Sequence, residues 1–177
     1  MTVVFDASFL IPLLDEDAQL GDPSVRPKVN YLVSELHKAR EVIVVPTPAL
    51  SEYLAGAGAA GPKYLQILTG SARFRVVPFD TLAAVEAAAD LASAIAAGDK
   101  KCGVAAPFQK IKFDRQIIAV ARVTGSARIY SNDPHFKTLV GTRGPEVVDF
   151  DELPEPPQDA QLKMRLDLPP ENADDEV

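Results

Sequence analysis

The sequence has a single cysteine and no long apolar run. Cys102 therefore has no partner within the chain for a disulfide. No apolar stretch approaches the roughly 20 residues that a helix needs to cross a bilayer, because Asp6, Pro12 and Asp15 interrupt the one near the N-terminus. No charged leader followed by a long apolar run precedes the first strand-like segment. We therefore expect a cytoplasmic protein without a role in a membrane.

Charge is unevenly distributed along the 177 residues, which carry a net charge of -7. Residues 151–177 hold nine acidic residues against Lys163 and Arg165, which leaves 16 residues of each sign in positions 1–150. The same end segment contains five prolines, and this composition resists both helix and sheet. We expect one globular domain over residues 1–150 and an acidic, proline-rich, largely disordered tail over 151–177. Within the tail, LKMRLDL (162–168) is apolar enough to dock, and whether it covers a site on its own domain is left open.

Short β-branched runs alternate with helical patterns along the first 150 residues. Helix punctuation accompanies them: Thr47 before Pro48 reads as an N-cap, Asp80 caps the next alanine-rich helix, and Gly98 and Gly125 stand where helices end. Strands separated by helices predict an α/β fold with a parallel sheet. The predicted strands are residues 2–5, 42–45, 74–77, 128–131 and 147–150.

Two acids follow predicted strands at the places where such sheets form sites. Asp6 ends the first strand in VVFDASFL, and Asp133 follows the fourth in YSNDPHF. In open parallel sheets, sites lie beyond the carboxyl ends of the strands, where the strand order reverses. If strands one and four are neighbours there, these two carboxylates face each other.

Two further acids lie early in predicted helices. Asp114 begins the apolar stripe of its helix, so we expect it to point inward from the first turn. Glu52, in LSEYL, lies in a mostly apolar helix, and its facing is not determined by its neighbours.

Each acid also has a purely structural interpretation. Asp114 could complement the helix macrodipole, and Asp133, ahead of Pro134, could be a turn or N-cap residue. Together they are harder to explain, because carboxylates at ~4 Å repel by about 4 kcal/mol at an effective dielectric constant near 20. A converging cluster therefore calls for protons or a cation. Oxygen ligands without nearby histidine or cysteine favour Mg²⁺ or Mn²⁺ over zinc.

The stretches VVFDASFL, LSEYL and KFDRQIIAVARVTGSARIYSNDPHF together resemble the PIN domain, and most closely the VapC-like toxin ribonucleases. The resemblance spans residues 2 to about 150. It implies a three-layer α/β/α sandwich whose five-stranded parallel sheet has the order 3-2-1-4-5. It also implies a metal-dependent endoribonuclease in which Asp6, Glu52, Asp114 and Asp133 are the catalytic residues and hold Mg²⁺ or Mn²⁺.

The resemblance implies further roles and partners. Ser8, Ser131 and Asn132 match positions whose side chains orient the carboxylates, although Ser8 is equally readable as a helix cap. The implied partners are RNA, an antitoxin protein and a second copy of the chain. The apolar helices at 48–57 and 62–69 would suit a homodimer seam, or could simply be core. His135 departs from the pattern, because relatives often have an acid at this place.

A basic segment precedes Asp114. Residues 99–115 contain five basic and two acidic residues, and we expect Lys110, Lys112 and Arg115 to bind the RNA backbone. The alternative is a solvated loop.

Three other functions compete with the ribonuclease. A non-catalytic PIN-fold module that binds RNA or protein would not need all four acids. A phosphoryl-transfer hydrolase with Asp6 as nucleophile would want a second acid where Ser8 stands. A receiver-type signalling domain would need an acceptor aspartate after the third strand. Asp80 lies there in this chain, but the paired early acids of such a domain are absent.

Overall fold

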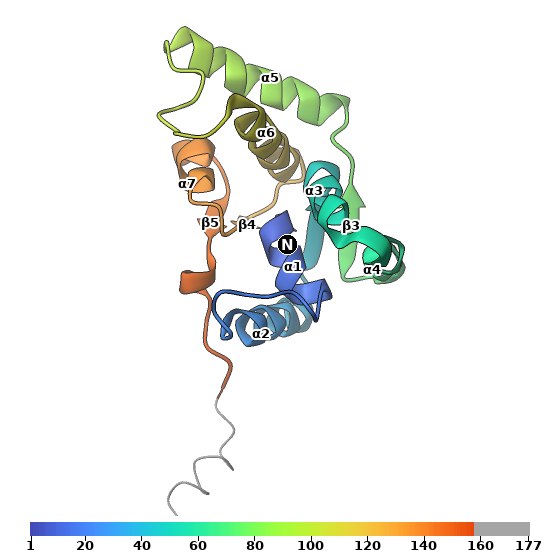
Figure 1. Ribbon diagram of the computed structural model, residues 1–177. Helices are drawn as coiled ribbons and strands as arrows, with labels where there is room; N and C mark the ends of the chain where they lie inside the picture. The colour runs from blue at the N-terminus through green and yellow to red at the C-terminus, as the bar shows by residue number, and fades with distance from the viewer. Residues whose placement is uncertain (158–177) are drawn as a thin grey trace, which may run out of the picture.

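Five parallel strands form one sheet in the computed structural model, which describes residues 1–157. The strand order is β3-β2-β1-β4-β5, so the parallel sheet and the implied order 3-2-1-4-5 are both confirmed. Figure 1 shows β3 and β5 on opposite sides of the molecule. The strands are β1 (Thr2–Phe5), β2 (Val42–Pro46), β3 (Phe74–Val77), β4 (Arg128–Tyr130) and β5 (Glu146–Val148).

The central strand β1 is apolar from Val3 to Phe5 because both faces of the sheet are covered. Val3 and Phe5 of β1 point into one hydrophobic cluster, and Val4 between them points into the other. All three side chains are fully buried. Continuous β-branched runs are what a parallel sheet buried on both sides requires.

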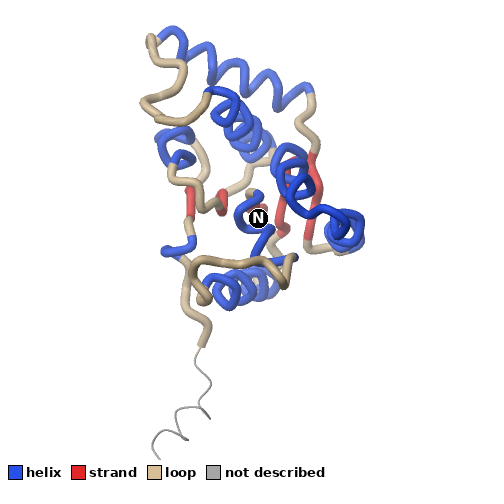
Figure 2. The backbone as a smooth tube through the Cα atoms, viewed as in Figure 1, coloured by secondary structure: helices blue, strands red, loops and turns tan. Residues whose placement is uncertain are grey.

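Helices cover both faces and complete the predicted three-layer sandwich (Figure 2). On one face lie α1 (Ala7–Leu14), α2 (Val25–Lys38) and α4 (Gly61–Gly70). On the other lie α5 (Thr81–Ala96), α6 (Phe108–Val123) and α7 (His135–Val140), with α5 packed on the outside of α6. Helix α3 (Thr47–Ala57) contributes to both clusters. Short 3-10 turns lie at Gly58–Ala60, Gly141–Arg143 and Phe150–Glu152.

The helix punctuation is confirmed except at one end. The Asp80 carboxylate accepts from the backbone N–H of Ala83 at 3.0 Å, and Gly98 and Gly125 follow α5 and α6 with positive φ. Thr47, however, is the first residue of α3 rather than its N-cap, which is Pro46. Its hydroxyl instead accepts from the backbone N–H of Phe79 at 3.0 Å and so ties α3 to the end of β3.

The first residues of the expected tail contact the domain. The fifth strand ends at Val148, because Asp149 and Glu152 form a capping box around the last 3-10 turn. Leu153 is buried in the core, and Glu155 pairs with Lys28 at 2.9 Å. These contacts hold residues that composition alone assigned to the tail. Residues 158–177 of the expected tail, including 162–168, lie outside the described residues.

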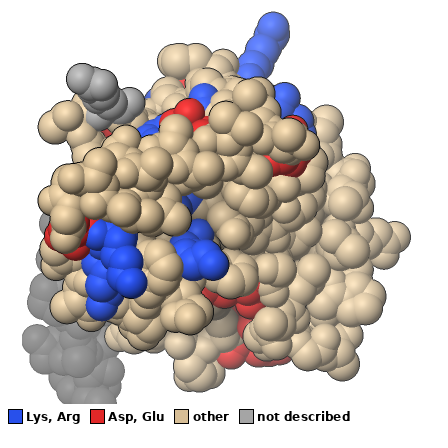
Figure 3. Space-filling view, turned by 90° about the horizontal axis from the view of Figure 1, so that it is seen from above, with Lys and Arg blue, Asp and Glu red and all other residues tan. Residues whose placement is uncertain are grey.

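Helix α5 exposes an apolar stripe. Leu82, Val85 and Ile95 are 62%, 63% and 59% exposed. The face of the molecule that carries α5 and α6 is accordingly dominated by uncharged side chains (Figure 3). Within residues 1–157 no helix has both the length and the apolar character that crossing a membrane requires.

Candidate functional site

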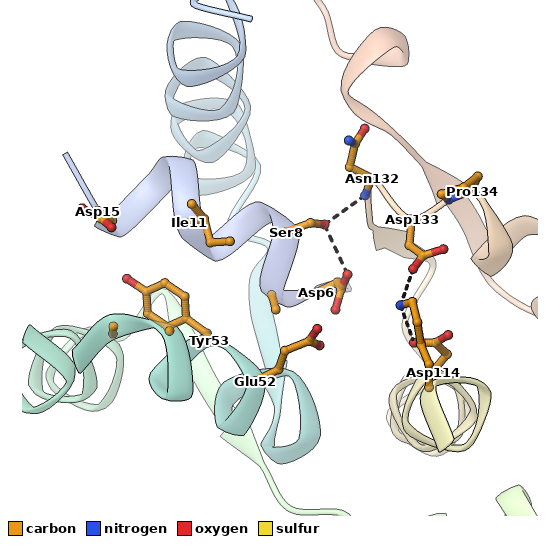
Figure 4. A pocket seen from close by; sticks show the side chains of 14 residues that line it. Asp6, Ser8, Ile11, Asp15, Glu52, Tyr53, Asp114, Asn132, Asp133 and Pro134 are labelled. Carbon is orange, nitrogen blue, oxygen red and sulfur yellow. Dashed lines mark hydrogen bonds and ion pairs between the residues drawn. The ribbon is translucent and has the colours of Figure 1, made fainter. Parts of the chain in front are cut away.

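A pocket of about 460 Å³ opens at the carboxyl ends of β1 and β4. Its lining brings together all four predicted acids, each from a different element (Figure 4). Asp6 follows β1 and is the N-cap residue of α1, and Asp133 follows β4. Glu52 comes from α3, and Asp114 comes from α6. The expectation that strands one and four are neighbours at this edge is therefore confirmed.

Asp6 is held by two hydroxyl groups. Ser131 donates to its Oδ2 at 2.9 Å and Ser8 donates to the same oxygen at 3.2 Å. The carboxylate is only 6% exposed, and burial raises its pKa although both hydrogen bonds favour the charged form. Ser8 makes no capping hydrogen bond to α1, so the orienting role predicted for it fits the structure better than a helix cap.

Asn132 supports this arrangement through its backbone. Its N–H donates to the Ser8 hydroxyl at 3.0 Å, which leaves the Ser8 hydrogen directed at Asp6. Within residues 1–157 no hydrogen bond joins the Asn132 amide to a pocket carboxylate, and Figure 4 shows that amide pointing away from Asp6. Asn132 therefore contributes through its main chain, and the role of its side chain stays a prediction.

Asp133 is fixed from three sides. Its backbone N–H donates to the Ser131 hydroxyl at 3.2 Å, its Oδ1 accepts from the backbone N–H of His135 at 2.8 Å, and Lys110 pairs with its Oδ2. Desolvation alone would raise the pKa of Asp133, but the bonds from Lys110 and His135 outweigh it and lower the pKa. Asp133 therefore forms a turn, which is one of the two interpretations of its place ahead of Pro134, and it is also a charged member of the pocket.

Asp114 points inward, as predicted, but not from the first turn. Helix α6 begins at Phe108, so Asp114 is its seventh residue and lies beyond the reach of the N-terminal dipole. Its side chain is 4% exposed, and its Oδ2 is buried without a hydrogen-bond partner. Burial, together with the charges of Asp133 and Asp6, raises its pKa to about 7 even though Lys110 acts against the shift.

Glu52 is the most exposed of the four acids and points toward Asp6 (Figure 4). Partial desolvation and then the charge of Asp6 raise its pKa. Its facing, which the sequence left undetermined, is thus toward the pocket.

Lys110 is the functional residue whose position the sequence did not reveal. It was assigned to RNA, yet its ammonium group lies inside the acidic pocket, 3.6 Å from Oδ1 of Asp114 and paired with Asp133. The dashed lines between Asp133 and Asp114 in Figure 4 mark these two ion pairs. The four-residue spacing of Lys110 and Asp114 on one helix was the available signal, since such pairs face each other.

The donor set suits a hard divalent cation. All four acids offer carboxylate oxygens, and the buried Oδ2 of Asp114 lacks any partner in the protein. With Lys110 between Asp114 and Asp133, no three acidic, histidine or cysteine side chains of the described part of the chain stand close enough to hold a metal ion. The residue types therefore fit Mg²⁺ or Mn²⁺, provided that the lysine moves.

Comparison with known proteins identifies the fold. The sequence matches no protein-family model and no curated protein. Among solved structures, it is similar to a chain of VapBC2 from Rickettsia felis bound to a promoter DNA fragment, with 12% identity, a TM-score of 0.60 and coverage of 84% of this chain and 98% of that one. It is also similar to a chain of FitAB bound to the IR36 DNA fragment, with 16% identity, a TM-score of 0.59 and coverage of 86% of this chain and 98% of that one. A chain of VapBC-1 from nontypeable Haemophilus influenzae has 11% identity and a TM-score of 0.56, with coverage of 85% of this chain and 99% of that one.

The chain has a PIN-like fold. The likeness covers nearly the whole of each compared chain, and it agrees with the resemblance carried by the three quoted stretches. At these identities it shows the fold, and the chemistry must be argued from the pocket.

The PIN fold places the three basic residues assigned to RNA in three different environments. Lys110 lies in the pocket, Lys112 is exposed on α6, and Arg115 is 4% exposed. Arg115 pairs with Asp90 of α5 and donates to the carbonyl oxygen of Lys100 at 3.3 Å. The guanidinium group of Arg115 thus joins α6 to α5 inside the protein, and its contact with RNA stays a prediction.

Both helices of the expected homodimer seam contribute to the core. Leu50 and Tyr53 of α3 and Tyr64 and Leu68 of α4 are buried. Leu65 and Ile67 of α4 remain 38% and 40% exposed, so a seam on this side of the PIN fold stays a prediction.

Proposed function

We propose that this protein is a metal-dependent endoribonuclease and the toxin of a toxin–antitoxin pair. The observation that best supports the activity is the convergence of four carboxylates from separate elements on one pocket. Like charges gathered at a strand-end crevice are unfavourable unless a cation balances them. The fold likeness to chains of the VapBC and FitAB complexes supports the toxin role and a protein partner.

Asp6, Glu52, Asp114 and Asp133 would hold Mg²⁺ or Mn²⁺. Such an ion supplies a water of lowered pKa for in-line attack at phosphorus and offsets the charge that develops on the leaving oxygen. The hydrogen bonds from Ser131 and Ser8 keep Asp6 in one orientation before any ligand arrives. Ser131 also accepts from the backbone of Asp133, so one hydroxyl aligns two of the four carboxylates.

No side chain of the protein needs to attack the phosphate. The two serines that line or support the pocket already direct their hydrogens at Asp6, which makes them poor nucleophile candidates. Tyr53 also lines the pocket and its hydroxyl has no hydrogen-bond partner, but burial raises its pKa, which makes it a poor nucleophile. Hydrolysis by water is the reaction that the four carboxylates support.

RNA has to approach an acidic pocket, so basic groups near its rim matter. Neither Lys112 nor Lys100 lines the pocket, although both are exposed. Lys112 lies on α6 roughly 160° around the helix axis from Lys110 and Asp114, and the Lys100 ammonium lies 4.9 Å from the centre of the Phe108 ring. We assign these lysines to sequence-independent contacts with the phosphate backbone.

The test is cleavage of RNA in Mg²⁺ or Mn²⁺, with and without chelator, by wild type, Asp6→Asn and Asp17→Asn. Asp17 is an exposed acid outside the pocket and serves as the matched control. We expect cleavage by wild type and Asp17→Asn, loss with chelator, and a fall of at least about 100-fold for Asp6→Asn. Equal cleavage by all three proteins would exclude this pocket.

One observation favours a second function, a non-catalytic PIN-fold module that binds RNA or protein. Lys110 already balances two of the carboxylates, so the pocket is stable without a metal ion. Retained RNA binding without cleavage of any substrate in either metal would support this module.

A further inference from the structure

Lys110 makes the contacts that a bound cation would make. Its ammonium group is 3.6 Å from Oδ1 of Asp114 and pairs with Oδ2 of Asp133. These two acids belong to different elements, α6 and the segment after β4, so the lysine closes one side of the pocket. Asp6 and Glu52 lie on the opposite side (Figure 4).

The lysine is held by charge rather than by packing. Its side chain is 42% exposed, whereas that of Asp114 is 4% exposed. A lysine side chain on a helix surface can reorient toward water without a change in the backbone. The ammonium group can therefore leave the pocket at little structural cost, provided that another positive charge replaces it.

A metal ion and the ammonium group exclude each other. Both would have to lie between Asp114 and Asp133, and two cations at that separation repel. The inference rests on the proposed function, because it concerns the same four carboxylates. We propose that Lys110 is a displaceable internal counter-cation: it keeps the pocket assembled without metal, and a divalent ion must expel it in order to bind.

This exchange has two consequences. Metal affinity is lower than the four carboxylates alone would produce, because each binding event breaks two ion pairs of the protein. The expelled ammonium group emerges at the pocket rim, where the phosphate of an RNA substrate would lie. Lys110 thus lowers the affinity for metal, and its ammonium group becomes available to the substrate only after a metal ion has displaced it.

The experiment compares wild type, Lys110→Met, Lys110→Arg and Lys38→Met by calorimetric titration with Mn²⁺ and by thermal unfolding in chelator. Lys38 is the control, since it makes a surface pair with Glu35 at 2.7 Å far from the pocket. We expect Lys110→Met to bind Mn²⁺ about tenfold more tightly and to unfold at lower temperature in chelator. Lys110→Arg and Lys38→Met should stay within about twofold of wild type in affinity.

A second measurement uses the wild-type protein only. Reductive methylation of Lys110, followed by mass spectrometry of its peptide, should become several-fold faster when Mn²⁺ is added. Methylation of Lys38 should not change.

The outcomes separate this inference from the proposed function. Equal Mn²⁺ affinity of wild type and Lys110→Met, or methylation of Lys110 that does not respond to Mn²⁺, would overturn the exchange and leave the nuclease proposal standing. Binding by Lys110→Met but not by wild type would support Lys110 as occupant of the cation position and refute metal-dependent catalysis. Absence of binding in both proteins would refute both proposals.

Discussion

Ser131 donates its hydroxyl hydrogen to Oδ2 of Asp6 at 2.9 Å and thereby joins the ends of β4 and β1 across 125 residues of sequence. Asp6 follows the central strand of the sheet, and Ser131 is 1% exposed. The bond places a polar contact at the point where strand order reverses, so the stability of the fold and the geometry of the pocket depend on the same pair.

Replacing Ser131 by alanine should destabilise the protein. The buried carboxylate of Asp6 would lose one of its two hydroxyl donors, which costs about 1 to 3 kcal/mol for a charged acceptor. The pKa of Asp6 should rise further, since this bond opposes the effect of burial. Urea unfolding at pH 8 in chelator measures the loss. Ser34→Ala, at an exposed position of α2, is the control, and an equal loss in both variants would show that the bond has no special weight.

Asp114 should make stability fall as pH rises toward neutrality. Its pKa is 3.8 in the unfolded reference and about 7 in the folded protein, so between these values the folded state binds more protons. The free energy of unfolding therefore decreases from about pH 4 to about pH 7 and levels off above. Asp114→Asn should lose this part of the slope and, at pH 8 in chelator, be more stable by about 1 to 3 kcal/mol.

The measurement is urea unfolding at several pH values in chelator, combined with calorimetric titration with Mn²⁺. Asp114→Asn should bind the ion more weakly than wild type. Strong destabilisation of Asp114→Asn at pH 8 would contradict the inference that burial and neighbouring acids disfavour the charged form of Asp114.

Asp90→Asn should destabilise the protein without affecting RNA. It removes the charge that pairs with buried Arg115 and also with Arg122, whose Nη1 lies 3.3 Å from Oδ1 of Asp90. Because Asp90 is only partly buried, we expect a loss of about 2 kcal/mol, below the usual cost of breaking a fully buried pair. Thermal unfolding and RNA affinity are measured together. Weaker RNA binding by Asp90→Asn at unchanged stability would instead support a role for Arg115 in binding the substrate.

Lys112→Met should reduce the salt dependence of RNA binding. Each phosphate contact contributes about 0.7 to the slope of log affinity against log salt for a single strand, so one lost contact lowers the slope by that amount. Titrations at several salt concentrations with Asp6→Asn as background prevent cleavage during the experiment. Lys38→Met should leave the slope unchanged. If both variants behave alike, Lys112 is only a solvated lysine.

The homodimer seam can be located by charge insertion on two exposed apolar sites. Leu65→Asp alters α4, where the sequence predicts the seam, and Val85→Asp alters the apolar stripe of α5. We expect a wild-type dimer in analytical ultracentrifugation, weakened by Leu65→Asp and retained in Val85→Asp. The reverse pattern would move the seam to α5.

Much of the architecture follows from local chemistry. The β-branched runs produce the strands, and Asp80 predicted the start of α5 because a carboxylate there satisfies an orphan N–H group. Acids after strands one and four had to meet at one edge, since parallel strands end on the same side. The end of the fifth strand was less accurate, because Asp149 caps the 3-10 turn that follows it, a contact that composition does not register.

The amino-acid sequence by itself determined which residues stand at strand ends and that a cluster of acids would need a positive charge. Only the tertiary structure decided which positive charge that is. Lys110 and Arg115 belong to the same basic segment, but five positions on a helix at about 100° per residue place them roughly 140° apart around its axis. Packing of α6 against the sheet and α5 turns Lys110 into the pocket and Arg115 toward Asp90, because a local pattern does not specify the rotation of a helix against its neighbours.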